Sequence, residues 1–185
     1  MNRSVTSKED ILAAARQLLL EEGSGALGMR NVAAACGVAV GSIYNYFPSK
    51  SALVSATIES IWAEMFRPFT AVACYDSFAD AVASLLTALD EGVAHFPGFF
   101  SLHALTFAAG DKAEGRARMM ALFDVLRDKL VQALAADANV REDVFDGALS
   151  QETFASYVLT LAISQRIHAG SNGDALLKMV RSCIY

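Results

Sequence analysis

Apolar residues recur every three or four positions along nearly the whole of this 185-residue chain. This helical spacing constrains the fold more than any other feature, because the apolar–polar alternation that marks strands is absent. We therefore predict an all-α protein of about nine helices. The predicted helices cover residues 6–23, 29–36, 40–46, 49–66, 77–95, 99–109, 112–136, 150–169 and 174–184.

Local signals place the ends of these helices. Thr6 and Glu9 have the spacing of a capping box and are expected to start the first helix. Pro68 is expected to end the helix that follows Ser49. Glycine, proline, asparagine and aspartate predict the remaining breaks, at 97–98, 110–111, 137–146 and 170–173.

The composition narrows the class of protein. No apolar run reaches the roughly 18 residues that a membrane span needs, and the first ten residues lack the apolar core of a secretory signal. Cys36, Cys74 and Cys183 form no CxxC pair, which favours a reducing compartment over disulfides or a metal site. We expect a cytoplasmic protein.

The charge of the chain is unevenly distributed. The net charge of −5 argues weakly against a nucleic-acid partner. Residues 1–50 carry five basic and four acidic residues, a net charge of +1. Residues 51–185 carry ten basic and sixteen acidic residues, a net charge of −6. A near-neutral segment of this kind can still place local positive charge on DNA.

Residues 30–47 fit a helix-turn-helix position by position. Ala33 supplies the small residue needed where two short helices cross, and Gly37 tolerates the positive φ of a tight turn. The second helix presents small or hydrogen-bonding residues outward, which suits the major groove of DNA. A helical hairpin packed inside a core is the alternative, and the polar outer face argues against it. The positions expected to be buried between the helices are Val32, Cys36, Val38, Ile43 and Tyr46.

The run MRNVAAACGVAVGSIYNYFPSKSALV resembles the DNA-binding signature of the TetR family of transcriptional regulators. The family pattern joins a helix-turn-helix to a Y-x-Y-F end, a P/N-S/N-K turn and an apolar helix, and it matches here over residues 8–53. Two positions depart from it. Gly28 and Ala39 stand where the family usually has serine or threonine, and each lost hydroxyl cap costs about 1 kcal/mol of helix stability.

The resemblance implies a homodimeric, ligand-responsive repressor that uses no cofactor, with a DNA-binding domain at 1–48 and a ligand-binding and dimerisation domain at 49–185. Arg30 is placed to reach a guanine edge, and Asn45 to reach a base or a phosphate. Tyr44, Tyr46 and Lys50 are expected to contact phosphates. The full set of predicted DNA-binding residues is Arg30, Val40, Gly41, Ser42, Tyr44, Asn45, Tyr46 and Lys50.

The last two helices each carry an apolar stripe, and two such stripes can build a four-helix interface across a two-fold axis, as similar proteins do. The alternative is that both stripes pack within their own bundle. The predicted dimer residues are Phe154, Val158, Leu161 and Gln165 in the first helix, and Leu176, Leu177, Val180 and Ile184 in the second.

Aromatic residues are frequent after residue 60 and alternate with small ones, which leaves room for a cavity. We expect a pocket for an apolar effector, with His103 or Tyr157 as the orienting polar group. The alternative is that these side chains only fill a core, in a constitutive DNA-binding dimer without an effector. The predicted lining is Trp62, Phe66, Leu85, Leu89, Phe100, His103, Phe107, Met119, Phe123 and Tyr157.

An enzyme is the rival from another class, and the motifs argue against it. Gly23, Gly25 and Gly28 spell G-x-G-x-x-G, but a helix precedes them where a dinucleotide site needs a strand, so we interpret them as an interhelix loop. The three histidines have no metal-ligand spacing, and no serine or cysteine stands in a nucleophile motif. We expect neither catalysis nor a metal.

Overall fold

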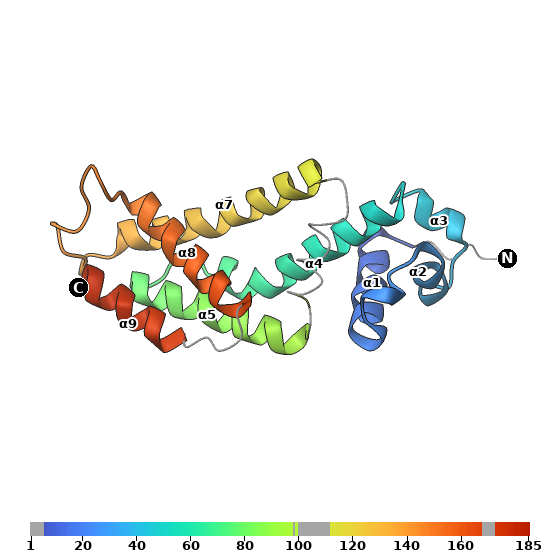
Figure 1. Ribbon diagram of the computed structural model, residues 1–185, viewed down its shortest axis with the longest axis horizontal. Coiled ribbons are helices and arrows are strands. Elements are labelled where there is room, and N and C mark those ends of the chain that lie inside the picture. Colours follow the sequence, from blue (N-terminus) through green and yellow to red (C-terminus); the bar gives the residue numbers. More distant parts are fainter. Residues whose placement is uncertain (1–5, 98, 100–111, 168–172) are drawn as a thin grey trace. The chain divides into compact units, whose positions relative to one another are not determined.

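The computed structural model describes residues 6–97, 99, 112–167 and 173–185, and every regular element in these ranges is a helix (Figure 1). The all-α prediction is confirmed, while almost all of the predicted helix 99–109 lies outside the described residues. The elements are α1 (Lys8–Glu22), the 3₁₀ helix η1 (Ser24–Ala26), α2 (Met29–Ala35), α3 (Val40–Tyr44), α4 (Lys50–Thr70), α5 (Phe78–His95), α7 (Lys112–Ala136), α8 (Gln151–Ile167) and α9 (Gly173–Ile184).

The chain divides into two compact units. Unit 1 comprises Met1–Glu64 and Phe96–Arg116, and unit 2 comprises Met65–His95 and Ala117–Tyr185. Helix α4 belongs to unit 1 up to Glu64 and to unit 2 beyond it. Among the described residues no helix is both long enough and apolar enough to span a membrane.

The capping box of α1 lies one residue later than the sequence predicted. The hydroxyl of Ser7 accepts the N–H of Asp10 at 3.0 Å, and the Asp10 carboxylate accepts the N–H of Ser7 at 2.9 Å. Thr6, the predicted cap, is buried instead. The prediction was wrong here because Ser7 also has an acidic residue three positions on, and that spacing alone cannot separate the two registers.

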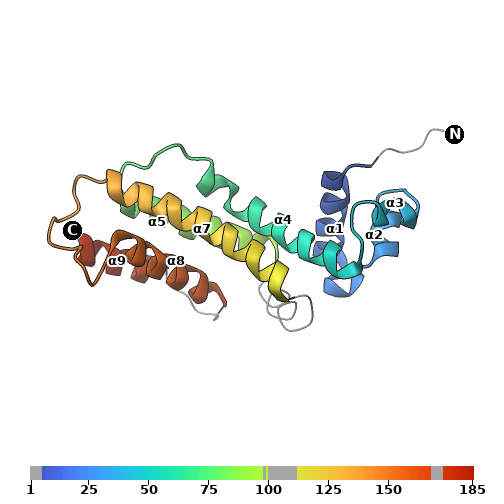
Figure 2. The same ribbon diagram turned by 90° about the horizontal axis from the view of Figure 1, so that it is seen from above.

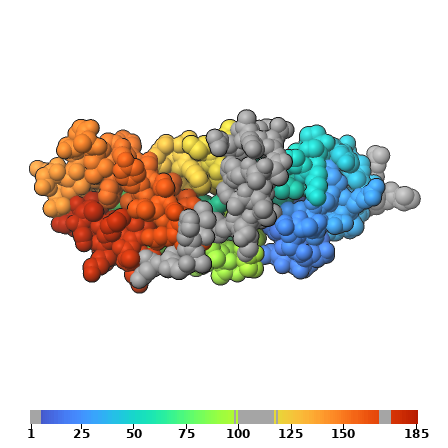
Figure 3. Space-filling view, viewed as in Figure 1, coloured from blue at the N-terminus to red at the C-terminus, as the bar shows by residue number. Residues whose placement is uncertain are grey.

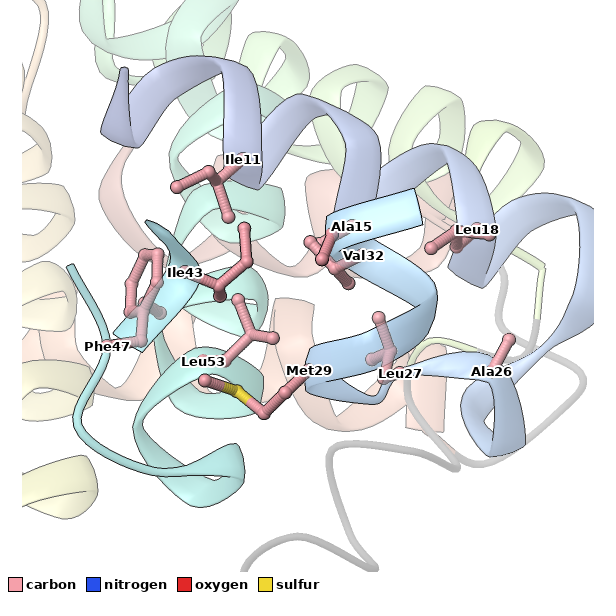
Figure 4. Close-up of a cluster of buried hydrophobic side chains, with 12 residues drawn as sticks. Ile11, Ala15, Leu18, Ala26, Leu27, Met29, Val32, Ile43, Phe47 and Leu53 are labelled. Carbon is pink, nitrogen blue, oxygen red and sulfur yellow. The ribbon is translucent and has the colours of Figure 1, made fainter. Parts of the chain in front are cut away.

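Unit 1 contains an apolar cluster that α1, α2, α3 and the start of α4 share (Figure 4). Val32 and Ile43 are fully buried as predicted, and Cys36 and Val38 pack against the cluster half-buried. The labelled members of the cluster are Ile11, Ala15, Leu18, Ala26, Leu27, Met29, Val32, Ile43, Phe47 and Leu53.

The sequence prediction placed the wrong aromatic residue in this cluster. Tyr46 was expected to be buried but is 42% exposed, whereas Phe47 is 3% exposed. Helix α3 already ends at Tyr44, so its helical spacing cannot be extended to residue 46. The backbone N–H groups of both Tyr46 and Phe47 bond to the carbonyl of Ile43, and this closing turn directs the phenylalanine inward.

Unit 2 is built around α5, which packs against α8 and α9 (Figure 2). Phe78 at the start of α5 contacts Phe154 of α8, with ring centroids 5.8 Å apart. Gly92 of α5 admits the α4 side chain of Met65, whose Cγ occupies the space that a Cβ at position 92 would need. The helices therefore approach closely at a position that has no side chain.

Asp137 joins three parts of unit 2. Its carboxylate accepts the backbone N–H of Phe78 at 2.9 Å, the hydroxyl of Tyr185 at 2.5 Å and the backbone N–H of Asn139 at 3.0 Å. Burial raises the pKa of Asp137, but these hydrogen bonds outweigh it and hold the pKa below its usual value. The start of α5, the segment after α7 and the end of the chain are thereby tied to one ionised group.

Pro68 does not end α4, contrary to the prediction. The helix continues to Thr70, where the Thr70 hydroxyl donates to the carbonyl of Phe66 at 3.0 Å. Proline removes only one backbone donor, and so near a helix end the loss does not stop the final turn.

Candidate nucleic-acid interface

Helices α2 and α3 meet at the turn that the sequence predicted. Gly37 has a φ of +65°, which a residue with a side chain rarely adopts, and Ala33 is 1% exposed. The N–H of Val38 bonds to the carbonyl of Ala33 at 3.0 Å and closes the turn. This geometry holds α3 against α2 with its remaining faces free of the core.

The two departures from the family signature have a visible consequence. Gly28 is the N-cap of α2 and Ala39 is the N-cap of α3, and neither helix has a side-chain cap. Helix α3 has only five residues, so it cannot be stable by propensity alone. Its position depends on the burial of Ile43 and on the turn at Gly37.

Most of the predicted DNA-binding residues lie on the surface of unit 1. Tyr44 is 52% exposed, and Arg30 and Lys50 form no ion pair within the part of the chain that the structure describes. Their positive charges are therefore available to a partner. Six of the eight predicted residues are exposed and two are half-buried. The exposed residues are Arg30, Gly41, Tyr44, Asn45, Tyr46 and Lys50, and the half-buried ones are Val40 and Ser42.

Two polar side chains of unit 1, those of Tyr46 and Arg16, already have partners within the chain. The hydroxyl of Tyr46 donates to the carbonyl of Thr6 at 2.6 Å. Arg16 of α1 pairs with Glu64 of α4 at 2.9 Å. Burial raises the pKa of the Cys36 thiol, and the negative charge of Asp10 raises it further, so the turn carries a neutral thiol at pH 7.

The residues predicted to line an effector pocket are distributed over both units. Trp62 lies in unit 1 with its ring edge-on to Phe99, at a centroid distance of 5.1 Å. In unit 2, Phe66, Leu85, Leu89 and Met119 are buried and Phe123 is half-buried. Tyr157 is 61% exposed on α8. Phe100, His103 and Phe107 lie outside the described residues.

The predicted dimer residues divide by exposure. Leu161 is 40% exposed, and Gln165 and Leu177 are half-buried. The other five are buried within unit 2, so for them the structure favours the intramolecular packing that was the alternative. These five are Phe154, Val158, Leu176, Val180 and Ile184.

The outer surface of α8 carries an apolar stripe that shares only Leu161 with the predicted one. Tyr157 and Leu161 are one helical turn apart and exposed, with Thr160 beside them. Met179 of α9 is 42% exposed, and α8 and α9 lie side by side on the face shown in Figure 3. The sequence placed Tyr157 in a pocket because its spacing from other aromatic residues does not show which side of α8 faces outward.

A groove of about 340 Å³ runs between α7 and α8. Phe123 is the only residue of the predicted pocket in its lining, which is mainly apolar but includes Asp124 and Arg127. In the described ranges, the groove included, no cluster of three or more histidine, cysteine or acidic side chains could hold a metal ion.

The N-terminal part of the chain matches a known protein family in sequence. Residues 11–57 match the model of the family described as bacterial regulatory proteins, tetR family, which confirms the resemblance. The match covers α2, α3 and parts of α1 and α4. No curated protein matches the chain in sequence.

Solved structures share the fold over nearly the whole chain. NemR of E. coli in its reduced form has a TM-score of 0.69 at 19% identity, over 96% of this chain and 97% of NemR. FadR of Bacillus subtilis, in complex with stearoyl-CoA, has a TM-score of 0.70 at 14% identity, over 97% of this chain and 100% of FadR. PfmR of Thermus thermophilus, a TetR family transcriptional regulator, has a TM-score of 0.56 at 20% identity, over 97% of this chain and 96% of PfmR. The TM-scores show a common fold, and at these low identities the likeness shows the fold alone.

Proposed function

Since residues 11–57 form a helix-turn-helix domain of the tetR family of bacterial regulatory proteins, we propose that this chain is a cytoplasmic transcriptional repressor without enzyme activity. It binds a pseudo-palindromic operator as a homodimer and is released by a small apolar effector. The observation that carries the proposal is the exposed surface of α2, α3 and the start of α4, where Arg30 and Lys50 have no acidic partner among the described residues.

In this proposal α3 lies in the major groove and Arg30 reaches a guanine edge from the start of α2. Tyr44 and Lys50 contact phosphates on either side, and Asn45 contacts a base or a phosphate. Guanidinium groups bind guanine through two hydrogen bonds, whereas an ammonium on a phosphate carries no sequence information. Arg30 and Lys50 should therefore have different effects on binding.

Arg30→Ala is expected to weaken operator binding by about 1–3 kcal/mol and to relax specificity at one base pair. Lys50→Ala should weaken binding to all sequences alike and reduce the slope of log K against log salt by about 0.9 for each subunit bound. Fluorescence anisotropy on the operator and on single-base variants measures both effects. Arg181→Ala, which removes an exposed arginine of α9, is the control. Unchanged binding by both Arg30→Ala and Lys50→Ala would refute this assignment.

The homodimer is proposed to form through the outer surface of α8, around Tyr157 and Leu161, with Met179 of α9 contributing. These exposed side chains replace the buried ones of the predicted stripes. Two-fold symmetry then separates the two recognition helices by about 34–36 Å or a multiple of it, so the operator has two inverted half-sites.

The effector is proposed to be a largely apolar compound. The fold relative FadR was solved with stearoyl-CoA, whose long acyl chain is apolar. Buried side chains such as Phe66, Leu85 and Leu89 supply an apolar interior in unit 2 of this chain, where an acyl or aromatic group avoids water. A constitutive DNA-binding dimer, in which these side chains only fill the core, is the competing function.

Trp62 offers a direct test of the effector, because it is the only tryptophan and is 1% exposed. We expect an apolar ligand from a panel of acyl and aromatic compounds to change Trp62 fluorescence and to weaken operator binding about 5- to 150-fold. The two titrations should give the same dissociation constant. If no compound in a broad panel changes the fluorescence or raises the melting temperature, the constitutive function is favoured.

A further inference from the structure

The start of α1 brings one more positive charge to the end of α3. Lys8 is exposed, and its Nζ lies 5.9 Å from the centroid of the Phe47 ring. Phe47 directly follows the exposed Tyr44–Tyr46 stretch and precedes the turn that leads to Lys50. The ammonium group of Lys8 therefore stands beside a DNA-facing segment that comes some forty residues later in the chain.

Tyr46 fixes this arrangement. Its hydroxyl donates to the carbonyl of Thr6 at 2.6 Å, and Thr6 lies two residues before Lys8. Thr6 is itself buried, so the bond sets the place where α1 begins. A phenolic hydroxyl has one proton to donate, and this one is used within the chain, so it cannot also be donated to a phosphate.

The charge of Lys8 is not neutralised by its acidic neighbours. The Asp10 carboxylate is bonded to the N–H of Ser7, and Lys8 forms no ion pair with Glu9 or Asp10 in the described part of the chain. The helix N-terminus is closed by its capping box and so is not itself an anion site. What remains for a partner is the ammonium group, held over an aromatic ring that limits where its stem can point.

We propose that Lys8 contacts a backbone phosphate of the operator beside the base pairs that α3 reads, and that Tyr46 is the positioning residue for this contact. The inference rests on the proposed function, since it requires DNA bound across α2 and α3. The partner is the duplex backbone, so the contact adds affinity and salt dependence without adding sequence preference.

Lys8→Ala tests the contact on a duplex selected from a random library by the wild-type protein. We expect the slope of log K against log salt to fall by about 0.9 for each subunit bound, equally on the selected and on scrambled duplexes. Lys8→Arg should keep the slope. Lys129→Ala is the control for a lysine beside an aromatic ring, because Lys129 is half-buried in unit 2 with its Nζ 6.0 Å from the ring centroid of Tyr75. It should leave the slope unchanged.

Tyr46→Phe tests the positioning. It should lower the slope when Lys8 is present and change it little in the Lys8→Ala background, whereas a purely structural role would lower the melting temperature and act equally in both. Equal effects in both backgrounds would overturn the role of Tyr46. A wild-type slope in Lys8→Ala, with binding still weakened by Arg30→Ala, would overturn the contact itself. If the wild type bound no duplex, the proposed function would fail, and this inference with it.

Discussion

Leu161→Glu is expected to convert the proposed homodimer into monomers and to weaken operator binding about 10²- to 10⁴-fold, because each helix-turn-helix then binds its half-site alone. Leu161 is 40% exposed on the outer surface of α8, one turn from Tyr157. A carboxylate there would have to be buried without a partner on association, which opposes the dimer, whereas in the monomer it stays in water. Light scattering gives the mass, and a mobility-shift titration gives the affinity.

Val125→Glu is the control for this variant. Val125 is 55% exposed on α7 and takes no part in the groove between α7 and α8, so the same charge at that position should leave the dimer intact. Circular dichroism of both variants checks that the helices form. A monomeric wild type, or a dimeric Leu161→Glu with full operator affinity, would exclude α8 as the interface.

Asp137→Asn is expected to cause the largest loss of stability among these changes, about 2–3 kcal/mol, since hydrogen bonds to a charged acceptor are among the stronger ones. The amide keeps the size of the side chain but not its charge, and it cannot accept from Phe78, Asn139 and Tyr185 as the carboxylate does. The melting temperature should fall by about 4–12 °C. Asp146→Asn is the control, because Asp146 is exposed and its carboxylate accepts the backbone N–H groups of Ala148 and Leu149, two and three residues on.

The same network predicts a pH dependence. Because folding lowers the pKa of Asp137, its contribution is complete above the unfolded value of about 3.9 and is lost as the pH falls through the lower folded value. The difference in stability between the wild type and Asp137→Asn should therefore be constant from pH 7 to 5 and shrink below about pH 4. Thermal melts across this range measure it. A difference that grows on acidification would contradict the assignment.

The helix-turn-helix could be predicted residue by residue because its constraints are local. Gly37 must adopt positive φ and Ala33 must be small, and both requirements can be recognised without knowing the rest of the fold. The prediction failed at Tyr46 because a helix of five residues ends before its spacing can be extended. The hydrogen bond from Tyr46 to Thr6 joins residues forty positions apart, and no local pattern indicates it.

The bundle was less predictable for a different reason. Helical spacing correctly grouped Leu176, Val180 and Ile184 on one face of α9, but burial inside a chain and burial between two chains require the same apolar residues. In α8 both Val158 and Leu161 are apolar, and only the packing against α5 shows that the first faces inward. Sequence periodicity therefore finds an apolar face without identifying what covers it.

The close approach at Gly92 limits how this part of the protein can change during evolution. Any side chain at position 92 would collide with Met65 at its Cγ, which is too near the backbone to move aside by rotation of the outer bonds alone. Met65 is 4% exposed and has little space into which it can turn. Residues 65 and 92 should therefore be inherited as a pair. Descendants that gain a side chain at position 92 are expected to carry a smaller residue at position 65, and that covariation would be visible in an alignment of orthologues.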